Sequence, residues 1–299
     1  MPAVTVLALL GPTASGKSRL AQRIATARGD VEIVAVDAFT VYRGMDVGTA
    51  KPSPQERSEV AHHLVDVLDP DQQLSVAEFQ DLARRAIAQI RGRGRVPLLV
   101  GGAGLYWRAV VDDLRFPPTD PHVRAAIERR FANDPAAAHR RLTEVDPTAA
   151  GRIDPPNLRR TVRALEVIEI TGERFSSFAT AREEHVSIYP DLTVGYLEPP
   201  TEQLREAIAH RARGMVAAGL LEEAAELRRR FALSATAAQA IGYAEAFAVL
   251  DGTLAAEELP DAISRRTWRY AKRQRAWFRA DPRCEPEAGD AALQRLTAA

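Results

Sequence analysis

The feature that most constrains the fold is a glycine-containing loop that directly follows an apolar run near the start of the chain. After residues 5–10, the sequence reads Gly11-Pro12-Thr13-Ala14-Ser15-Gly16-Lys17-Ser18. This satisfies G-x-x-x-x-G-K-[ST], a pattern in which a strand leads into a loop and the loop into a helix. Backbone N–H groups and the helix N-terminus bind phosphate oxygens, Lys17 adds a charge, and Ser18 can ligate Mg²⁺. We therefore expect a phosphate site, with a purely structural glycine-rich turn as the alternative.

Apolar runs and helical patterns alternate over the first hundred residues, which predicts an α/β fold. Strands are expected at residues 5–10, 32–36 and 96–100, with helices starting near Lys17 and covering much of 75–91. Such alternation produces a parallel sheet covered by helices, whose ligand loops gather at the carboxyl ends of the strands. The third strand runs into Gly101-Gly102 without a carboxylate. That weakens the interpretation as an ATP-dependent enzyme without excluding it.

The middle of the chain changes in character. Helical segments rich in Ala, Arg and Glu predict a mostly helical insertion at residues 114–189, within a core formed by residues 1–113 and 190–299. A single cysteine, Cys284, excludes an internal disulfide and offers no zinc spacing, which fits the cytoplasm. The apolar start is too short for a membrane span. Basic and acidic residues balance at 40 each, so only local clusters can indicate nucleic-acid binding.

Two basic clusters are candidates for contact with RNA phosphates. The first lies between Leu82 and Val111, a stretch without Asp or Glu, where solvated helix ends are an equally good interpretation: Arg84, Arg85, Arg91, Arg93, Arg95 and Arg108. The second follows helical spacing near the C-terminus and is interpreted as facing RNA: Arg265, Arg266, Arg269, Lys272 and Arg273. Trp268 and Trp277 beside it are expected to pack, as are His62 and His63.

An ordered series of segments covering nearly the whole chain resembles the tRNA dimethylallyltransferase family. It starts with the phosphate loop and Asp37, followed by Val41-Tyr42-Arg43-Gly44-Met45-Asp46-Val47-Gly48-Thr49-Ala50-Lys51-Pro52. The later segments are His62-His63-Leu64-Val65-Asp66, Val100-Gly101-Gly102-Ala103-Gly104-Leu105-Tyr106, Arg160-Thr161-Val162-Arg163-Ala164-Leu165-Glu166-Val167, Gln239-Ala240-Ile241-Gly242-Tyr243 and Tyr270-Ala271-Lys272-Arg273-Gln274. The resemblance implies a P-loop NTPase-like parallel sheet flanked by helices, with the helical insertion contacting tRNA.

The resemblance also implies a reaction and a set of residues. A dimethylallyl group would move from dimethylallyl diphosphate to the N6 amine of the adenosine immediately 3′ of the tRNA anticodon, with Mg²⁺ and without a zinc-binding tail. Asp37 matches the general base, Lys17 and Arg211 match residues at the diphosphate, and the loop Gly11 to Ser18 holds it. From position alone, Asp37 could instead cap its loop or serve magnesium, and Arg211 could be an exposed helix charge. The positions matching tRNA contacts are Asp37, Ala38, Phe39, Thr40, Ala103, Arg124, Arg159, Arg160 and Arg163.

Four positions depart from the family pattern. Ala38-Phe39-Thr40 stands where many members have Ser-Met-Gln, and Ala103 where a threonine is usual. Arg159 replaces a glutamine, and Ala244 a lysine. The first two concern the reaction centre, so they imply weaker activity, a different acceptor, or compensation from a neighbour such as Thr40.

Three rival functions remain open at this stage. An adenylate dimethylallyltransferase of the cytokinin type would prenylate free nucleotides, but a small acceptor needs neither the helical insertion nor the basic C-terminal helix. A P-loop kinase of a small metabolite is disfavoured by the missing strand-end carboxylate. A tRNA-binding protein without catalysis is disfavoured by the intact Gly16, Lys17, Ser18 and Asp37. The expected partners are the tRNA anticodon stem-loop and dimethylallyl diphosphate, and the expected protein is a monomer that binds no membrane.

Overall fold

The computed structural model describes residues 5–182 and 185–299, and these form two compact units. Met1–Asp112 and Ser187–Ala299 make up one, the core unit. Asp113–Val186 make up the other, the helical unit. The sequence predicts an insertion at residues 114–189, and the helical unit has its boundaries at residues 113 and 186.

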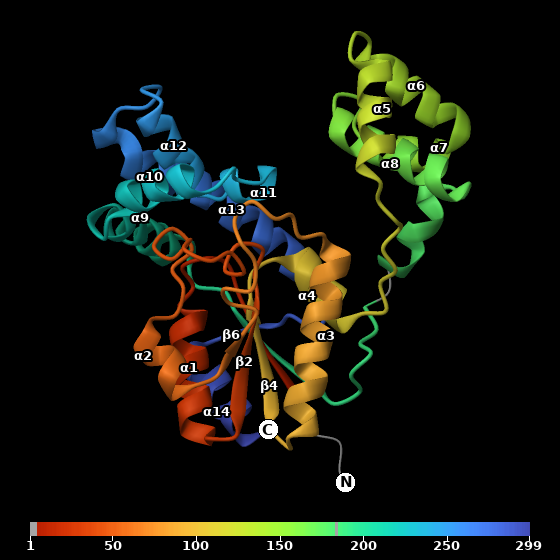
Figure 1. The fold of residues 1–299 in the computed structure, drawn as a ribbon. Coiled ribbons are helices and arrows are strands. Elements are labelled where there is room, and N and C mark those ends of the chain that lie inside the picture. Colours follow the sequence, from red (N-terminus) through yellow and green to blue (C-terminus); the bar gives the residue numbers. More distant parts are fainter. Residues whose placement is uncertain (1–4, 183–184) are drawn as a thin grey trace. The chain divides into compact units, whose positions relative to one another are not determined.

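One six-stranded, fully parallel sheet organises the core unit (Figure 1). Its spatial order is β3-β2-β4-β1-β5-β6. In chain order the strands are β1 (Val6–Leu10), β2 (Val31–Val36), β3 (His62–His63), β4 (Val96–Gly101), β5 (Leu192–Leu197) and β6 (Pro286–Glu287). Every residue of β1 and β4 is buried, which is why these strands are continuous apolar runs in the sequence. The prediction of an α/β fold with a parallel sheet is confirmed.

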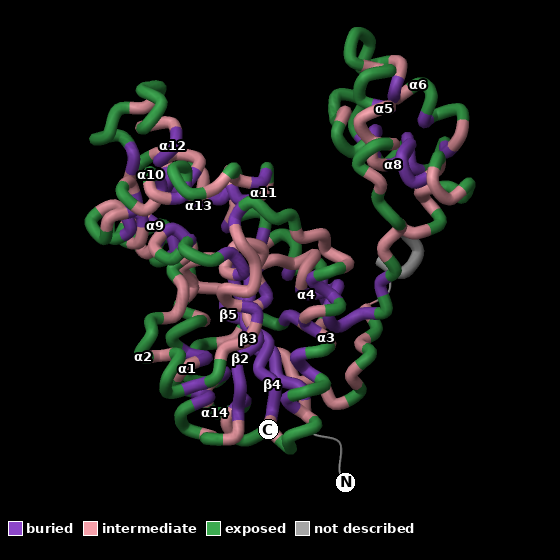
Figure 2. Tube along the Cα trace, viewed as in Figure 1, coloured by how far each residue is buried: buried purple, intermediate pink, exposed green. Residues whose placement is uncertain are grey.

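Helices cover both faces of this sheet, α1 (Lys17–Arg28) and α14 (Gly289–Ala298) on one and α3 (Val76–Gly92) and α4 (Gly104–Val111) on the other. The other helices of the core unit are α2 (Pro54–Glu59), α9 (Thr201–Ala217), α10 (Leu220–Arg230), α11 (Ala235–Ala238), α12 (Tyr243–Leu250), the short η2 (Ala256–Glu258) and α13 (Leu259–Arg279). Alternate residues of β1 face opposite sides: Val6 and Ala8 belong to the cluster with α3 and α4, whereas Leu7 and Leu9 join α1 and α14. Figure 2 shows the strands buried between these layers.

The helical unit consists of α5 (Pro121–Phe131), α6 (Pro135–Val145), α7 (Pro147–Arg152), α8 (Leu158–Thr171) and the 3₁₀ segment η1 (Phe175–Arg182). Three of its helices begin with the same device, an aspartate cap followed by proline: Asp120, Asp134 and Asp146 each accept hydrogen bonds from first-turn amides. Proline suits the first helical position because its missing N–H would be unpaired there. The Asp-Pro pairs at residues 120–121, 134–135 and 146–147 are therefore helix starts.

The chain leaves and re-enters the core unit at neighbouring points. Asp112 and Ser187 form an antiparallel bridge, and the Ile188 amide donates to the Val111 carbonyl at 2.8 Å. Asp112 is buried and pairs with Arg108 and with Arg283, whose guanidinium lies 2.5 Å from it. Both ends of the insertion are thus fixed in the core. Among the described residues, no helix is long and apolar enough to cross a membrane.

Candidate active site

The phosphate loop joins β1 to α1, as the sequence predicts. Ala14 and Gly16 adopt positive φ of 63° and 84°, so the loop turns tightly before the helix starts. Gly16 caps α1 without a side-chain hydrogen bond, which leaves first-turn amides available for an anion. A Cβ on Gly11 would lie 2.8 Å from the Leu197 carbonyl oxygen, so that position requires glycine. The Lys17 ammonium donates to the Pro12 carbonyl at 3.2 Å.

Gln274 of α13 anchors this loop, a role that the sequence did not indicate beyond placing the residue in a family segment. Its Oε1 accepts from the Thr13 amide at 2.9 Å, and its Nε2 donates to the Gly102 carbonyl at 2.8 Å. The side chain is buried. The Thr13 amide, grouped above with the amides of a diphosphate site, is therefore bound to Gln274. The Ser15 amide donates to the Pro12 carbonyl at 3.2 Å. Gly16 to Ser18 are left as the part of the loop whose amides can bind phosphate.

A cavity above the carboxyl ends of the strands brings together two of the three expected catalytic residues, Asp37 and Arg211, while Lys17 does not line it. Thr13, Asp37, Thr49 and Arg211 form its polar side, although they come from four separate segments. Its apolar side comes from Phe39, Met215, Ala240, Ile241 and Ile263, with Tyr270 beside them. A polar and an apolar half in one pocket suit a ligand with a charged head and a hydrocarbon tail.

Two cations and one carboxylate determine the electrostatics of this cavity. Burial and the nearby charge of Arg211 lower the pKa of Lys17 to about 8, against the opposing pull of Asp37. Burial also lowers the pKa of Arg211, again opposed by Asp37. The Arg211 Nη2 donates to the Thr49 carbonyl at 3.3 Å, so it is not an exposed helix charge. Two cations with one carboxylate leave an excess of positive charge that favours an anionic ligand.

Asp37 follows β2 and projects into the cavity. Its Oδ1 accepts from the amides of Phe39 at 2.8 Å and Thr40 at 3.3 Å, a local turn that fixes the carboxylate. Within the described part of the chain, no hydrogen bond reaches Oδ2. One oxygen therefore orients the group while the other can accept a proton. Burial, together with the charge of Asp37, raises the pKa of Tyr106 to about 12, so that phenol stays neutral.

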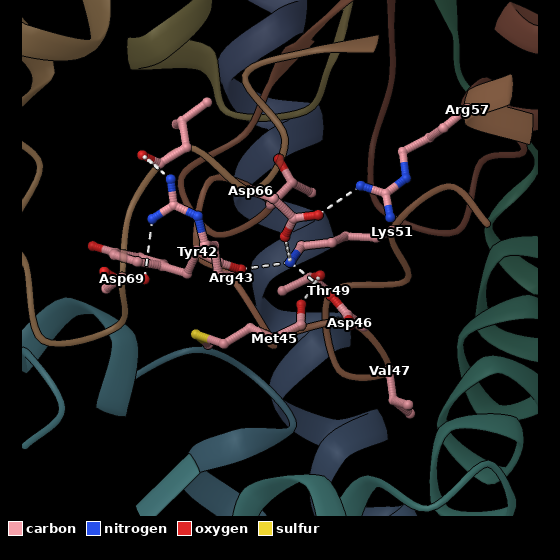
Figure 3. Close-up of polar contacts among 12 residues, drawn as sticks. Tyr42, Arg43, Met45, Asp46, Val47, Thr49, Lys51, Arg57, Asp66 and Asp69 are labelled. Carbon is pink, nitrogen blue, oxygen red and sulfur yellow. Dashed lines mark hydrogen bonds and ion pairs between the residues drawn. The ribbon is translucent and has the colours of Figure 1, made fainter. Parts of the chain in front are cut away.

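The segment after Asp37 forms another wall of the cavity and is held from outside by two helices. Glu223 of α10 accepts from the Asp46 and Val47 amides at 3.2 and 3.0 Å (the segment is drawn in Figure 3). The Tyr243 hydroxyl accepts from the Gly48 amide and donates to Glu223. A Cβ on Gly48 would lie 2.3 Å from the Tyr243 ring, so only glycine fits there.

Ala103 caps α4 and forms no side-chain hydrogen bond, so the hydroxyl usual at this position in the family is missing from a helix start. Its neighbour Gly104 lies under the indole of Trp277, because a Cβ there would approach that ring within 2.0 Å. Trp277 is 43% exposed. The expectation that it packs is correct for one part of the ring, while the rest faces solvent.

The expected tRNA-contact arginines of the insertion belong to the helical unit, whereas the cavity belongs entirely to the core unit. Arg159 and Arg160 are exposed at the start of α8. Arg124 and Arg163 both bind the fully buried Glu166, with N···O distances of 3.0 Å. The two pairs therefore differ, since one is exposed and the other holds a buried carboxylate.

The structure corrects the interpretation of the first basic cluster. Most of its arginines bind groups of the core unit: Arg84 donates to the Ala109, Val110 and Asp112 carbonyls, Arg91 pairs with Asp191, Arg93 and Arg95 pair with Glu32, and Arg108 pairs with Asp112. These contacts stabilise helix ends and the sheet, and Arg85 alone of the six is exposed without a recorded ion pair among the described residues. His62 and His63 pack as expected, on the Val60 carbonyl and Glu32.

The second basic cluster separates into two classes. Arg266 pairs with Glu245 at 2.9 Å, so it holds α13 against α12. The other members are exposed along one side of α13: Arg265, Arg269, Lys272 and Arg273. Trp268 packs against Leu204 and Ile208, with Arg205 stacked 4.6 Å above its ring.

The residues present suit a magnesium ion that is bound mostly through phosphate. Across residues 5–182 and 185–299, no group of three or more His, Cys, Asp or Glu side chains could hold a metal. Ser18 is exposed on the first turn of α1, where its hydroxyl is available. Mg²⁺ commonly binds through one or two protein oxygens together with phosphates and water, so a single hydroxyl beside a diphosphate is compatible with it.

Comparison with known proteins places this chain in a large protein family. Residues 40–281 match the family model described as IPP transferase. The chain is 48% identical to a tRNA dimethylallyltransferase of Kineococcus radiotolerans, covering 94% of this chain and 90% of that protein. It is 47% identical to one of Thermobifida fusca, covering 93% and 88%.

Solved structures agree with this assignment. A tRNA isopentenylpyrophosphate transferase of Bacillus halodurans superposes with a TM-score of 0.71 at 37% identity, covering 98% of this chain and 94% of that one. A eukaryotic dimethylallyltransferase, described as acting on tRNA, gives a TM-score of 0.78 at 26% identity, covering 92% and 70%.

Proposed function

The chain belongs to the IPP transferase family and is a tRNA dimethylallyltransferase, and from this premise we propose which atoms react and which residues act on them. The dimethylallyl group moves from dimethylallyl diphosphate to N6 of the adenosine immediately 3′ of the anticodon. The observation that carries this proposal is the cavity lined by Asp37 and Arg211, whose charges both act on the nearby Lys17.

The donor binds with its diphosphate on the loop between β1 and α1. Amides of Gly16 to Ser18, the Lys17 ammonium and the Arg211 guanidinium contact phosphate oxygens, and Gly11 to Ser15 shape the loop. As the allylic C–O bond breaks, charge builds on the leaving diphosphate, so these groups stabilise the transition state more than the ground state. Met215, Ile241 and Ile263 contact the five-carbon chain, since they form the apolar side of the cavity.

The Ser18 hydroxyl would hold a Mg²⁺ ion that binds with the diphosphate, and such an ion would supply neutralisation of the charge on the leaving group. The protein ligand set is small, consistent with a metal that binds with the donor.

The acceptor base reaches the cavity from the side of Asp37. An adenosine in the anticodon loop must leave its stack to present N6, as for other enzymes that modify bases. The adenine amine is a weak nucleophile, so Asp37 Oδ2 accepts its proton while N6 bonds to the allylic carbon. The C–O bond breaks, diphosphate leaves with the electron pair, and the proton passes from Asp37 to solvent.

The tRNA contacts extend over both units. Ala38, Phe39, Thr40 and Ala103 contact the target base and its neighbours, with Thr40 compensating for the missing amide. In the helical unit Arg124, Arg159, Arg160 and Arg163 contact the RNA backbone, most directly the exposed Arg159 and Arg160. The exposed ridge of α13 adds charge without base specificity. We expect a monomer working in the cytoplasm.

The rival functions are less well supported. Relatives sharing nearly half of the residues are tRNA dimethylallyltransferases, which disfavours transfer to free nucleotides and a loss of catalysis. A kinase would ordinarily place a carboxylate at the end of β4, where this chain has Gly101 and Gly102.

Transfer of a labelled dimethylallyl group tests the proposal. Three acceptors are compared with Mg²⁺ present: unmodified tRNA with adenosine 3′ of the anticodon, the same tRNA with guanosine there, and free AMP. We expect label only on the first. Label on AMP alone would replace the proposal with the nucleotide enzyme.

The variant Asp37→Asn sharpens this test. Asn retains an oxygen for the Phe39 and Thr40 amides but cannot accept a proton, so we expect turnover to fall by about 100-fold or more with donor binding intact. The matched control is Asp69→Asn, an exposed loop carboxylate paired with Arg43. Normal turnover by Asp37→Asn would remove this residue from the base role.

A further inference from the structure

Lys51 is a charged side chain buried at the centre of the loop that carries the acceptor residues. Its side chain is 3% exposed. The ammonium donates to the Tyr42 carbonyl at 2.5 Å, to Asp46 Oδ1 at 2.7 Å and to Asp66 Oδ1 at 2.5 Å (Figure 3). Tyr42 and Asp46 belong to the loop of residues 38–51 and Asp66 to a second stretch of chain, so one ammonium ties together two segments that contain no regular secondary structure.

The backbone around Lys51 is held in an unfavourable conformation. Ala50, Leu64 and Asp66 have positive φ of 50°, 62° and 56°. Among described non-glycine residues, only Ala14 in the phosphate loop shares this property. Such conformations are unfavourable for residues with a Cβ and persist where the surrounding contacts impose them, often at functional sites. Ala50 directly precedes Lys51, Leu64 lies two residues before Asp66, and Asp66 is itself a partner of the ammonium.

The same segments lead directly to the walls of the cavity. Tyr42, whose carbonyl accepts from Lys51, donates its amide to the Phe39 carbonyl at 3.2 Å, and Phe39 lines the cavity. On the other side, Thr49 lies two residues before Lys51 and also lines the cavity. The Thr49 carbonyl accepts from Arg211, the expected diphosphate contact. A displacement of Lys51 would therefore move both an acceptor wall and a partner of Arg211.

We propose that Lys51 is a positioning residue that fixes the loop of residues 38–51, and that through the Thr49 carbonyl it sets the position of Arg211 for the donor diphosphate. The inference rests on the proposed function, because it uses Arg211 as a donor contact. An ammonium suits this position, since its hydrogens point to a backbone carbonyl and two carboxylates at once.

Arg57 provides a natural comparison. It binds Asp66 Oδ2 at 2.6 Å from the outer side and is 37% exposed. Arg57 therefore supplies charge to the same carboxylate, but no recorded contact joins it to the backbone of the loop 38–51. If neutralising Asp66 were all that mattered, losing either cation would have the same effect on catalysis.

The experiment compares Lys51→Met with Arg57→Met in the complete protein. Met matches the length of the lysine side chain but donates no hydrogen bond. We expect Lys51→Met to raise the KM for dimethylallyl diphosphate by about tenfold and to lower kcat, because Arg211 loses its fixed partner. Arg57→Met should leave the donor KM within about twofold of wild type. A role in folding alone would reduce the active fraction and leave the KM unchanged.

Two further variants keep the result interpretable. In Lys51→Met, Asp66 loses its inner partner. Adding Asp66→Asn removes that unpaired charge, so the double variant should be more stable than Lys51→Met while its donor KM stays high. Arg211→Lys alone should raise the donor KM. Adding Lys51→Met to Arg211→Lys should then change the donor KM by less than about twofold, because the two residues act through one contact.

Each outcome bears on a different claim. A normal donor KM in folded Lys51→Met, or an equal rise in Arg57→Met, would overturn the role of Lys51. A normal donor KM in Arg211→Lys would contradict the proposed role of Arg211 itself, and with it the route from Lys51 to the donor. A raised KM in Arg211→Lys beside a normal KM in Lys51→Met would reject Lys51 alone.

Discussion

At the scale of single residues, Arg211 lines the cavity, and its charge disfavours the protonated form of the nearby Lys17. The pKa of Lys17 falls to about 8 from an ordinary 10.5, through burial first and the arginine second. The unfolded chain therefore binds more protons than the folded one between these values, and this residue makes the protein more stable as pH rises through that window. Donor binding has the opposite sign, because a diphosphate prefers the protonated lysine.

We predict that the affinity for dimethylallyl diphosphate is constant below pH 7.5 and declines by up to about tenfold per pH unit above pH 8. Titration calorimetry with Mg²⁺ present at pH 6.5 to 9.5 measures this. Lys17→Met is the control. It should bind the donor weakly, and its affinity should not show this decline above pH 8. An affinity of the wild type that is flat to pH 9.5 would show that Lys17 stays protonated in the free protein.

Ala103 allows a second prediction at this scale. It caps α4 with extended backbone, φ −88° and ψ 96°, but has no side-chain oxygen for the first-turn amides. Ala103→Thr supplies one, so we expect the free energy of unfolding to rise by about 1 kcal/mol in urea denaturation. Ala103→Val has the same shape without the hydroxyl and should bring no such gain. Equal stability of the Thr and Val variants would mean that the new hydroxyl does not cap the helix.

At the scale of elements, the sheet was predictable because strands buried on both faces are continuous apolar runs. The helices α1 and α3 were predictable from their periodicity and from the caps Gly16 and Ser75. Arginine was harder to interpret, since the sequence does not tell a phosphate contact from a partner of a distant carboxylate. Glu32, for example, pairs with Arg93 and Arg95, which lie about sixty residues away in the sequence and come close only when the sheet forms. Gln274 was missed for the same reason, because its two partners lie at the ends of β1 and β4.

The contact of α13 with the phosphate loop leads to a prediction about Gln274. Gln274→Met removes the partners of the Thr13 amide and the Gly102 carbonyl together, so the loop is no longer held to the end of β4. We expect the KM for the donor to rise by about tenfold and the stability to fall by about 1–3 kcal/mol. Steady-state kinetics and urea denaturation measure the two effects separately.

Gln80 provides the matched control for that experiment. It is a buried glutamine on α3 whose amide donates to the Ala109 carbonyl at 2.7 Å, and it does not line the cavity. Gln80→Met should cost comparable stability and leave the donor KM unchanged. If both variants raised the donor KM equally, general loosening of the core would explain the effect, and Gln274 would have no special link to the loop.

At the scale of the whole molecule, the chain combines a complete donor cavity with a separate helical unit. All residues that line the cavity belong to the core unit, and the helical unit has its own hydrophobic cluster around Ile127, Leu142 and Val162. Asp112 and Ser187 already pair where the insertion leaves the core. We therefore expect the core unit to fold and bind the donor by itself, whereas the proposed RNA contacts lie in both units.

We accordingly predict that replacing residues 113–186 by a short glycine linker leaves donor affinity within about twofold of wild type and weakens tRNA binding by about 100-fold, since backbone contacts dominate affinity for RNA. Donor calorimetry and tRNA filter binding measure the two affinities.

The double variant Arg159→Gln with Arg160→Gln in the full chain should reproduce part of the loss of tRNA affinity. It should also reduce the slope of log affinity against log salt by about 1.5. The control pair is Arg140→Gln with Arg141→Gln, exposed arginines of the same unit that bind Asp134 and Glu144. Because Arg140 and Arg141 are already neutralised by their carboxylate partners, their replacement should not change the salt dependence of tRNA binding. An equal change for both pairs of variants would mean that the net charge of the unit, and not a defined RNA contact at α8, determines the salt dependence.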